Sequence, residues 1–365
     1  MNRKNFIWML VITASLLGMT GCSLPETEES GVERELLCQF REGCRYVTNG
    51  EQYWEEKNPE WDLYWLLMDD QRSRPEELRF EFTEDIEHEV FALNKDYQII
   101  WKNTFGSGRH SALVPETAMG FMFSVRETEL FQPVGTGMHP RMETPLTGRC
   151  LSVLGDSVSA FAGYIPWEDY AYYSNMNFGA ASMWWAVLAE KTGMEICKIN
   201  AVSSSGIVVP EGAMADRQLK GNSERCCNLS SKRGESPDEI LVMLGGNDYL
   251  EQVLTERIRQ EYLDMLSRIK RAYPNAHIYV CTYFQSPTLT SVPLEELNRL
   301  LRDVAQEAEV GLIDFEDCGI LESETEKYLI DGILHPNERG QILLGVCAAQ
   351  KCGHMRRRLT SGRYI

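Results

Sequence analysis

Short apolar runs alternate with helical patterns from residue 150 to residue 352, and this alternation leaves few folds open to the chain. The continuous apolar run at 239–244 is typical of a strand buried on both faces. Residues 251–272 instead repeat apolar residues at helical spacing until Pro274. Alternating strands and helices predict a parallel sheet with right-handed crossovers, which binds ligands at the carboxyl ends of its strands. The expected strands are 150–154, 195–200, 239–244, 277–283 and 310–315, and the expected helices are 178–191, 251–272, 294–308 and 337–350.

The first of these strands ends in Gly155-Asp156-Ser157. The glycine permits a sharp turn, and Asp156 and Ser159 both suit the start of a helix. A serine there lies beside free backbone N–H groups and the positive end of a helix dipole, which stabilise an oxyanion. Gly-Asp-Ser alone also fits an ordinary strand-to-helix turn. The blocks at the later strand ends favour the chemical interpretation.

Polar blocks also follow the later strands. The block 200–206 closes on Gly206, Asn247 and Asp248 follow the third expected strand, and His335 precedes the last helix. Each block alone fits a surface loop or a helix cap, but the carboxyl ends of parallel strands meet at one edge of a sheet. Ester hydrolysis needs a nucleophile, a base and donors for an oxyanion. His335 is the only one of six histidines in such a setting, and we expect Asp248 to cap the following helix.

These four blocks resemble the signature of the SGNH/GDSL hydrolase superfamily, which is Gly-Asp-Ser, a loop glycine, Gly-x-Asn-Asp and Asp-x-x-His-Pro. The resemblance spans 150–352, and its stretches 163–166 and 184–185 are similar to exported bacterial members. It implies a flavodoxin-like α/β/α sandwich over 149–352 and an ester hydrolase without a cofactor. It also implies the roles of single residues: Ser157 as nucleophile, His335 as base, and the Ser157 N–H, the Gly206 N–H and the Asn247 side-chain amide as oxyanion donors.

One residue departs from the superfamily pattern. The usual acid lies three residues before the histidine, where this chain has Gly332. Asp331 lies one residue earlier, so its carboxylate reaches the imidazole only if the turn is one residue longer. We expect Asp331 to complete a catalytic triad in this way. The alternative is a dyad in which a backbone carbonyl orients His335.

The first residues have the pattern of a secretory signal. Arg3 and Lys4 precede an apolar run at 6–19 that is too short to span a membrane as a mature helix, and Cys22 follows small residues. The arrangement resembles a bacterial lipobox, although Met19 stands where leucine is usual, and it predicts export and a lipid anchor on Cys22. Ordinary secretion with cleavage elsewhere is the alternative. We expect 1–22 to be the signal peptide and 23–60 a tether.

Residues 61–126 contain several strand patterns and no long helical period. The runs 78–82 and 89–93 both alternate apolar and polar residues. They predict a small antiparallel β-sandwich, whose aromatic residues either fill its core or line a sugar-binding face. We expect 127–148 to be a linker because it holds several prolines and glycines, and 353–365 to be a basic tail.

Charge and cysteine content exclude some functions. A net charge of −18 argues against nucleic acid and anionic membranes as main partners. The sequence has no H-E-x-x-H motif and no C-x-x-C pair, so we expect no metal site. Export would permit disulfides, and Cys38 and Cys44 form the most plausible local pair. The cysteines inside apolar runs are more typical of small buried hydrophobic residues.

The predicted function is removal of short acyl groups, O-acetyl above all, from an extracellular polysaccharide or glycan. Aromatic residues follow the nucleophile directly and are expected to wall the site, and no long apolar lid is evident. A lipase or lysophospholipase, an acetyltransferase and a catalytically inactive glycan-binding lipoprotein stay open as alternatives. The aromatic residues are Phe161, Tyr164, Trp167, Tyr170, Tyr172 and Tyr173.

Overall fold

The computed structural model describes two folded parts, an N-terminal β-module over 32–138 and an α/β domain over 144–360. The predicted signal peptide, its Cys22 and the aromatic residue Trp167 lie outside the described residues. The description covers residues 32–42, 44–48, 53–68, 74–127, 131, 133–138, 144–166, 170–175, 177–209, 219–287 and 294–360.

Five parallel strands form the sheet of the α/β domain, and they confirm the predicted fold class. Their order in the sheet is β13-β12-β14-β15-β16. The strand order therefore reverses at β12, and a doubly wound sheet binds its ligands at such a point. The strands are β12 (Cys150–Gly155), β13 (Glu195–Ala201), β14 (Glu239–Met243), β15 (His277–Cys281) and β16 (Gly311–Ile313).

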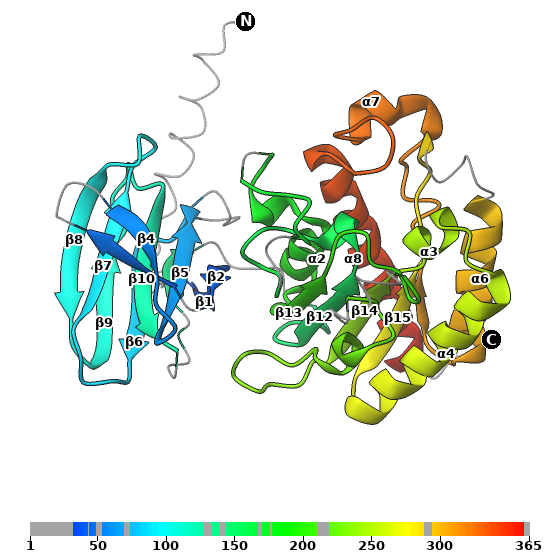
Figure 1. The fold of residues 1–365 in the computed structure, drawn as a ribbon, viewed down its shortest axis with the longest axis horizontal. Helices are drawn as coiled ribbons and strands as arrows, with labels where there is room; N and C mark the ends of the chain where they lie inside the picture. Colours follow the sequence, from blue (N-terminus) through cyan, green and yellow to red (C-terminus); the bar gives the residue numbers. More distant parts are fainter. Residues whose placement is uncertain are drawn as a thin grey trace, which may run out of the picture. The chain divides into compact units, whose positions relative to one another are not determined.

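Helices flank this sheet, with α2 packed against α8 and α4 against α6 (Figure 1). Gly193 adopts a φ of +74° at the end of α2, as expected of a left-handed C-cap. The last helix continues to Thr360, so much of the predicted basic tail is helical. No helix among the described residues is long and apolar enough to cross a membrane. The helices are α2 (Trp184–Thr192), α3 (Gly246–Leu250), α4 (Thr255–Ala272), α6 (Leu294–Glu307), α7 (Thr325–Tyr328) and α8 (Glu338–Thr360).

The β-module has two antiparallel sheets and a separate hairpin, which confirms the predicted β-sandwich. One sheet has the order β1-β11-β6-β9 and the other β2-β5-β10-β7-β8, while β3 pairs with β4. Phe80, Phe82 and Phe123 are buried together in its core, as half of the alternating residues of a sandwich must be. The strands are β1 (Val32–Glu35), β2 (Gln39–Arg41), β3 (Cys44–Thr48), β4 (Tyr53–Lys57), β5 (Trp61–Leu67), β6 (Glu77–Phe82), β7 (His88–Leu93), β8 (Ile99–Phe105), β9 (Gly108–Leu113), β10 (Gly120–Arg126) and β11 (Val134–Met138).

The limits of the β-module differ from the sequence prediction. The predicted tether, 23–60, contains β1 to β4, and the predicted linker, 127–148, contains β11. These strands are short and rich in polar residues, so they carry little hydrophobic pattern. Pairing with other segments stabilises β1, β2 and β11 instead: β11 lies between β1 and β6 and satisfies the backbone groups of both, and β2 pairs with β5. The strands β3 and β4 pair with each other.

Cys38 and Cys44, the most plausible local pair if the chain were oxidised, are not joined in this structure, which contains no disulfide among its described residues. Cys38 directly precedes β2, which pairs with β5, whereas Cys44 begins β3, which pairs with β4. The two cysteines thus adjoin strands of different sheets.

Candidate active site

Ser157 lies at the carboxyl end of β12, the point where the strand order reverses. It is the first residue of a short 3₁₀ helix, Ser157–Ser159, whose N-cap is Asp156. The Asp156 Oδ1 accepts a hydrogen bond from the Val158 N–H at 3.0 Å, which fixes this turn. Burial raises the pKa of Asp156 to about 6. Gly155 is required for space rather than for the turn, because a Cβ there would lie 2.7 Å from the Ser159 Oγ.

Ser157, His335 and Asp331 form a continuous chain of hydrogen bonds. The Ser157 Oγ lies 2.9 Å from the His335 Nε2, and the His335 Nδ1 lies 2.6 Å from the Asp331 Oδ2. The structure thus places the Asp331 carboxylate, rather than a backbone carbonyl, on the imidazole. Gly332 allows the longer turn, since it adopts a φ of +72° that favours glycine.

The surroundings of these hydrogen bonds keep Asp331 ionised and His335 neutral. Burial alone would raise the pKa of Asp331, but hydrogen bonds from the N–H groups of Leu334, Ile333 and His335 and from the imidazole hold that pKa well below its usual value. Burial lowers the pKa of His335, and Asp331 offsets this only in part. A neutral imidazole with its Nδ1–H on Asp331 leaves its Nε2 free to accept a proton from Ser157.

Asn247 lies on α3, directly after β14. Its Nδ2 donates to the Ser205 carbonyl oxygen at 2.9 Å, which uses one of its two N–H groups and orients the other. Gly245 precedes this helix with a φ of +116°, a conformation that L side chains rarely adopt. The sequence therefore placed this amide correctly at a strand end.

The N–H of Gly206 was expected to be an oxyanion donor, but it already has a hydrogen-bond acceptor. Its N–H donates to the Val209 carbonyl oxygen at 3.0 Å, so it is engaged within its own loop. Asp248 causes this curl, because its carboxylate accepts from the N–H groups of Ile207, Val208 and Val209 at 2.6–3.0 Å. We expected Asp248 to cap the following helix, but it lies inside α3, whose N-cap is Gly245, and its carboxylate holds the preceding loop instead. A Cβ on Gly206 would lie 2.2 Å from the Asp248 Oδ2, which explains the glycine.

Arg225 ties the end of β12 to this loop, and no pattern in the sequence indicates this role. The residue is 2 % exposed. Its guanidinium donates to the Gly155 carbonyl at 2.9 Å, the Asn200 carbonyl at 2.8 Å and the Ser205 hydroxyl at 2.5 Å. A buried guanidinium with several oxygen acceptors is satisfied without an ion pair. It therefore fixes the ends of β12 and β13 relative to the loop that precedes Gly206.

Tyr283 joins the nucleophile turn to the helix of Asn247. Its hydroxyl donates to the Asp156 Oδ2 at 2.7 Å and accepts from the Gly246 N–H at 3.0 Å. Burial and the nearby Asp156 raise the pKa of Tyr283 well above its usual value, so it stays protonated as a donor.

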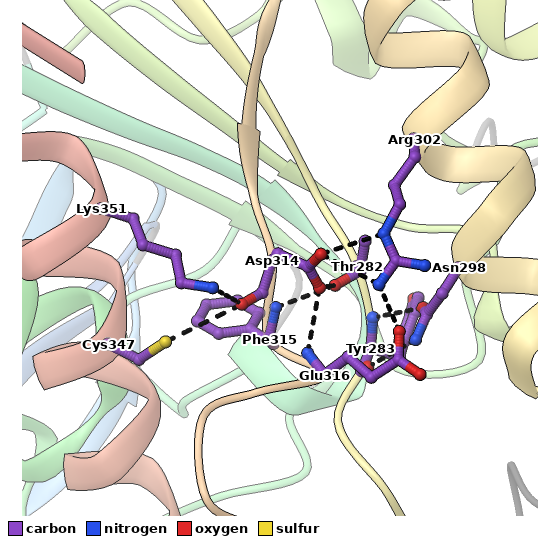
Figure 2. Close-up of polar contacts among 9 residues, drawn as sticks. All are labelled: Thr282, Tyr283, Asn298, Arg302, Asp314, Phe315, Glu316, Cys347 and Lys351. Carbon is purple, nitrogen blue, oxygen red and sulfur yellow. Dashed lines mark hydrogen bonds and ion pairs between the residues drawn. The ribbon is translucent and has the colours of Figure 1, made fainter. Parts of the chain in front are cut away.

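The support for Tyr283 comes from α6 and from β16 (Figure 2). Asn298, which is fully buried, accepts from the Tyr283 N–H at 2.8 Å and donates to its carbonyl at 2.9 Å. The Thr282 hydroxyl donates to Asp314 at 2.7 Å, and Arg302 pairs with the same carboxylate at 2.9 Å. These contacts fix the end of β15 and, through Tyr283, the site itself.

The aromatic segment is only in part a wall of the site. Phe161 and Tyr173 are fully buried and belong to the core, whereas Tyr172 is 36 % exposed beside His335. Within the described residues, no group of three or more His, Cys, Asp or Glu side chains is placed to hold a metal ion.

A serine, a histidine and an aspartate joined at the strand ends of a doubly wound sheet have the arrangement of a serine hydrolase. The sequence model of the GDSL-like lipase/acylhydrolase family matches residues 153–342. The chain belongs to this family, as the sequence resemblance predicted.

Three solved structures illustrate what the chain is similar to. A GDSL-like lipase from Bacteroides ovatus is 18 % identical with a TM-score of 0.46, over 58 % of this chain and 99 % of its own. A GDSL-like lipase from Bacteroides uniformis is 20 % identical with a TM-score of 0.43, and the match covers 56 % of this chain and 94 % of that protein. A carbohydrate esterase family 2 enzyme with a carbohydrate-binding domain from Myceliophthora fergusii is 13 % identical with a TM-score of 0.42, over 87 % and 98 %. A search of curated proteins finds no match.

Proposed function

We propose that the protein is a serine esterase in which Ser157 is the nucleophile. The observation that carries this proposal is the hydrogen-bonded chain from the Ser157 Oγ through His335 to Asp331, with links of 2.9 and 2.6 Å. The Ser157 Oγ attacks the ester carbonyl carbon while its proton passes to the His335 Nε2. The imidazolium then protonates the leaving alcohol, and an acyl-serine ester remains.

The second half of the reaction uses the same groups in reverse. His335 takes a proton from water, the resulting hydroxide attacks the acyl-serine carbonyl, and the proton returns to the Ser157 oxygen as the acid leaves. We assign the Ser157 N–H and the second N–H of Asn247 as donors to the oxyanion formed in each half. Gly206 becomes a third donor only if its N–H leaves the Val209 carbonyl, so we assign the main role to Asn247.

For the substrate, we propose a short acyl group, O-acetyl above all, on a glycan. Ser157 is only 7 % exposed, which favours a small acyl group over a bulky one. The exposed ring of Tyr172 offers an amphipathic surface to a polar carrier. Rates on p-nitrophenyl esters should fall steeply from acetate to octanoate, and acetate release from a panel of acetylated glycans should identify the carrier. A flat series with no acetate release from any glycan would contradict this substrate.

A lipase or lysophospholipase is the second candidate, and the loop of the base favours it. Ile330 and Ile333, on either side of Asp331, are 40 % and 53 % exposed. Exposed apolar side chains next to a base can contact a longer acyl chain. The same ester series decides between the candidates, because a lipase would be faster on octanoate than on acetate.

We propose that the protein is exported and lipid-anchored through Cys22. The support is the sequence pattern of 1–22 alone. Metabolic labelling with a radioactive fatty acid in a bacterial host tests it. The full chain should incorporate label and sediment with membranes, and Cys22→Ser should not. Equal labelling of the two proteins would contradict the anchor.

A further inference from the structure

Tyr172 covers one face of the imidazole of His335. Their ring centroids lie 3.5 Å apart and the ring planes differ by 14°, which is a face-to-face stack. A stacked ring restricts rotation of the imidazole about the Cα–Cβ and Cβ–Cγ bonds of the histidine side chain. The negative face of an aromatic ring also attracts a cation, so the same ring stabilises the imidazolium that forms when Ser157 loses its proton.

The hydroxyl of Tyr172 reaches the acid as well. It donates to the Asp331 Oδ2 at 3.2 Å, the same oxygen that accepts from the His335 Nδ1 at 2.6 Å. Burial and the nearby Asp331 raise the pKa of Tyr172 to about 12, so the phenol stays a donor at neutral pH. One side chain therefore contacts both the base and its acid.

The backbone around Tyr172 is tied to both catalytic elements. The N–H groups of Tyr172 and Tyr173 both donate to the Ala160 carbonyl, at 3.1 and 3.0 Å, directly after the 3₁₀ helix of Ser157. The buried Tyr173 hydroxyl donates to the Pro336 carbonyl at 2.9 Å, one residue beyond His335. The segment thus joins the nucleophile turn to the loop of the base.

We propose that Tyr172 is a positioning residue that holds the imidazole of His335 and the Asp331 carboxylate in their working orientation. This inference rests on the proposed esterase function. It goes beyond the triad, because the residue comes from a segment outside the four blocks of the superfamily pattern. On p-nitrophenyl acetate, which has no glycan carrier, Tyr172 acts through His335 and Asp331, so its loss should affect kcat more than KM.

The test compares two substitutions that remove different parts of the side chain. Tyr172→Leu removes the stack and the hydroxyl, and we expect kcat on p-nitrophenyl acetate to fall about 10- to 30-fold with KM within about threefold. Tyr172→Phe keeps the stack, so we expect rescue to within about threefold of the wild-type kcat.

The acidic limb of the pH profile separates positioning from a merely structural role. The titratable groups that contact His335 in the described residues are Asp331, Tyr172 and Tyr173. Loss of the hydroxyl leaves the Asp331 carboxylate with one donor fewer, so its attraction for the imidazolium grows. The limb of Tyr172→Phe should therefore move to higher pH by a few tenths of a unit.

Two control variants change aromatic side chains that the proposal does not use, one on α3 and one in the β-module. Tyr249→Phe removes a phenol that donates to Glu296 at 2.9 Å, and Tyr97→Leu removes a ring that is 57 % exposed in the β-module. Both should keep wild-type kcat, and all variants should keep the wild-type melting temperature within a few degrees. Wild-type kcat and pH profile in Tyr172→Leu would overturn the inference. Absence of hydrolysis in the wild-type enzyme would instead overturn the proposed function.

Discussion

Two histidines of this protein are stacked on aromatic rings, one in the α/β domain and one in the β-module. His335 lies on Tyr172 with centroids 3.5 Å apart, and His88 lies on Phe82 with centroids 4.0 Å apart. His88 is fully buried, and its Nδ1 lies 3.2 Å from the Ser124 carbonyl. His335 instead stands between a carboxylate and a serine hydroxyl. A similar stack therefore fills a core in one place and supports a base in the other.

The position in the sheet explains the difference. His88 begins β7 of an antiparallel sheet, where its side chain points into the packed interior. His335 follows the last strand of a parallel sheet, at the edge where the strand ends bring several polar blocks together. The sequence distinguished the two, because only His335 belongs to a polar block between strand and helix.

Substitution of the two histidines should give the largest difference between the two regions, in kcat for His335 and in melting temperature for His88. We expect His335→Gln and Ser157→Ala to lower kcat about 10⁴-fold or more, because each removes a member of a unit that acts together. His88→Gln should lower the melting temperature by changing a packed core, with kcat of the folded enzyme unchanged. Steady-state kinetics and thermal unfolding measure the two effects. A full loss of kcat in folded His88→Gln would contradict the assignment.

Substitution of Asp331 should have the next largest effect on kcat. Asp331→Asn keeps the shape of the side chain but removes the charge that stabilises the imidazolium, and we expect kcat to fall about 10²- to 10⁴-fold. The Asp331→Ala variant tests the dyad alternative. A near-wild-type rate in both would remove Asp331 from the mechanism, although it lies 2.6 Å from the Nδ1.

Asn247 should have a smaller effect than the triad. Asn247→Ala removes the N–H that we assign to the oxyanion, and the loss of one such donor typically costs about 2.7–4 kcal/mol, or about 10²- to 10³-fold in kcat. Asn247→Asp keeps the shape without the donor and should behave alike. Gly206→Ala is unsuitable as a comparison, because its Cβ would collide with Asp248. Wild-type turnover in both Asn247 variants would exclude this amide as an oxyanion donor.

The smallest expected effect concerns the pH dependence of activity, which depends on His335. Activity requires a neutral His335, so kcat/KM should fall as pH drops through the pKa of that group. Burial lowers that pKa from its ordinary value, so the fall should lie below about pH 6.5. Asp331 stays ionised across this range because its pKa is held well below the usual value. A limb above pH 7 would contradict this electrostatic account.

Local patterns in the sequence predicted the sheet and most of the site. Apolar runs identified all five parallel strands, and the blocks at their ends contained Ser157, Asn247 and His335. The spacing of Asp331 was open, and it depended on a positive φ at Gly332 that a sequence does not display.

Contacts between distant segments could not be predicted from the sequence. Nothing near Arg225 indicates that its side chain binds the carbonyl at the end of β12. Likewise, Asp248 has the pattern of a helix cap but accepts from the N–H groups of a loop about forty residues earlier. The strands β1 and β2 were missed for the same reason, because they pair with β11 and β5, which their own residues do not predict.

The central claim is that Ser157 is a nucleophile activated by His335. Covalent labelling tests this claim most directly. The purified protein is treated with a fluorophosphonate probe and followed by intact mass spectrometry and peptide mapping. We expect the wild-type protein to gain one probe on Ser157, His335→Gln to react much more slowly, and Ser157→Ala to gain none. Labelling of Ser157→Ala at the wild-type rate, or no labelling of the wild-type protein, would contradict the account.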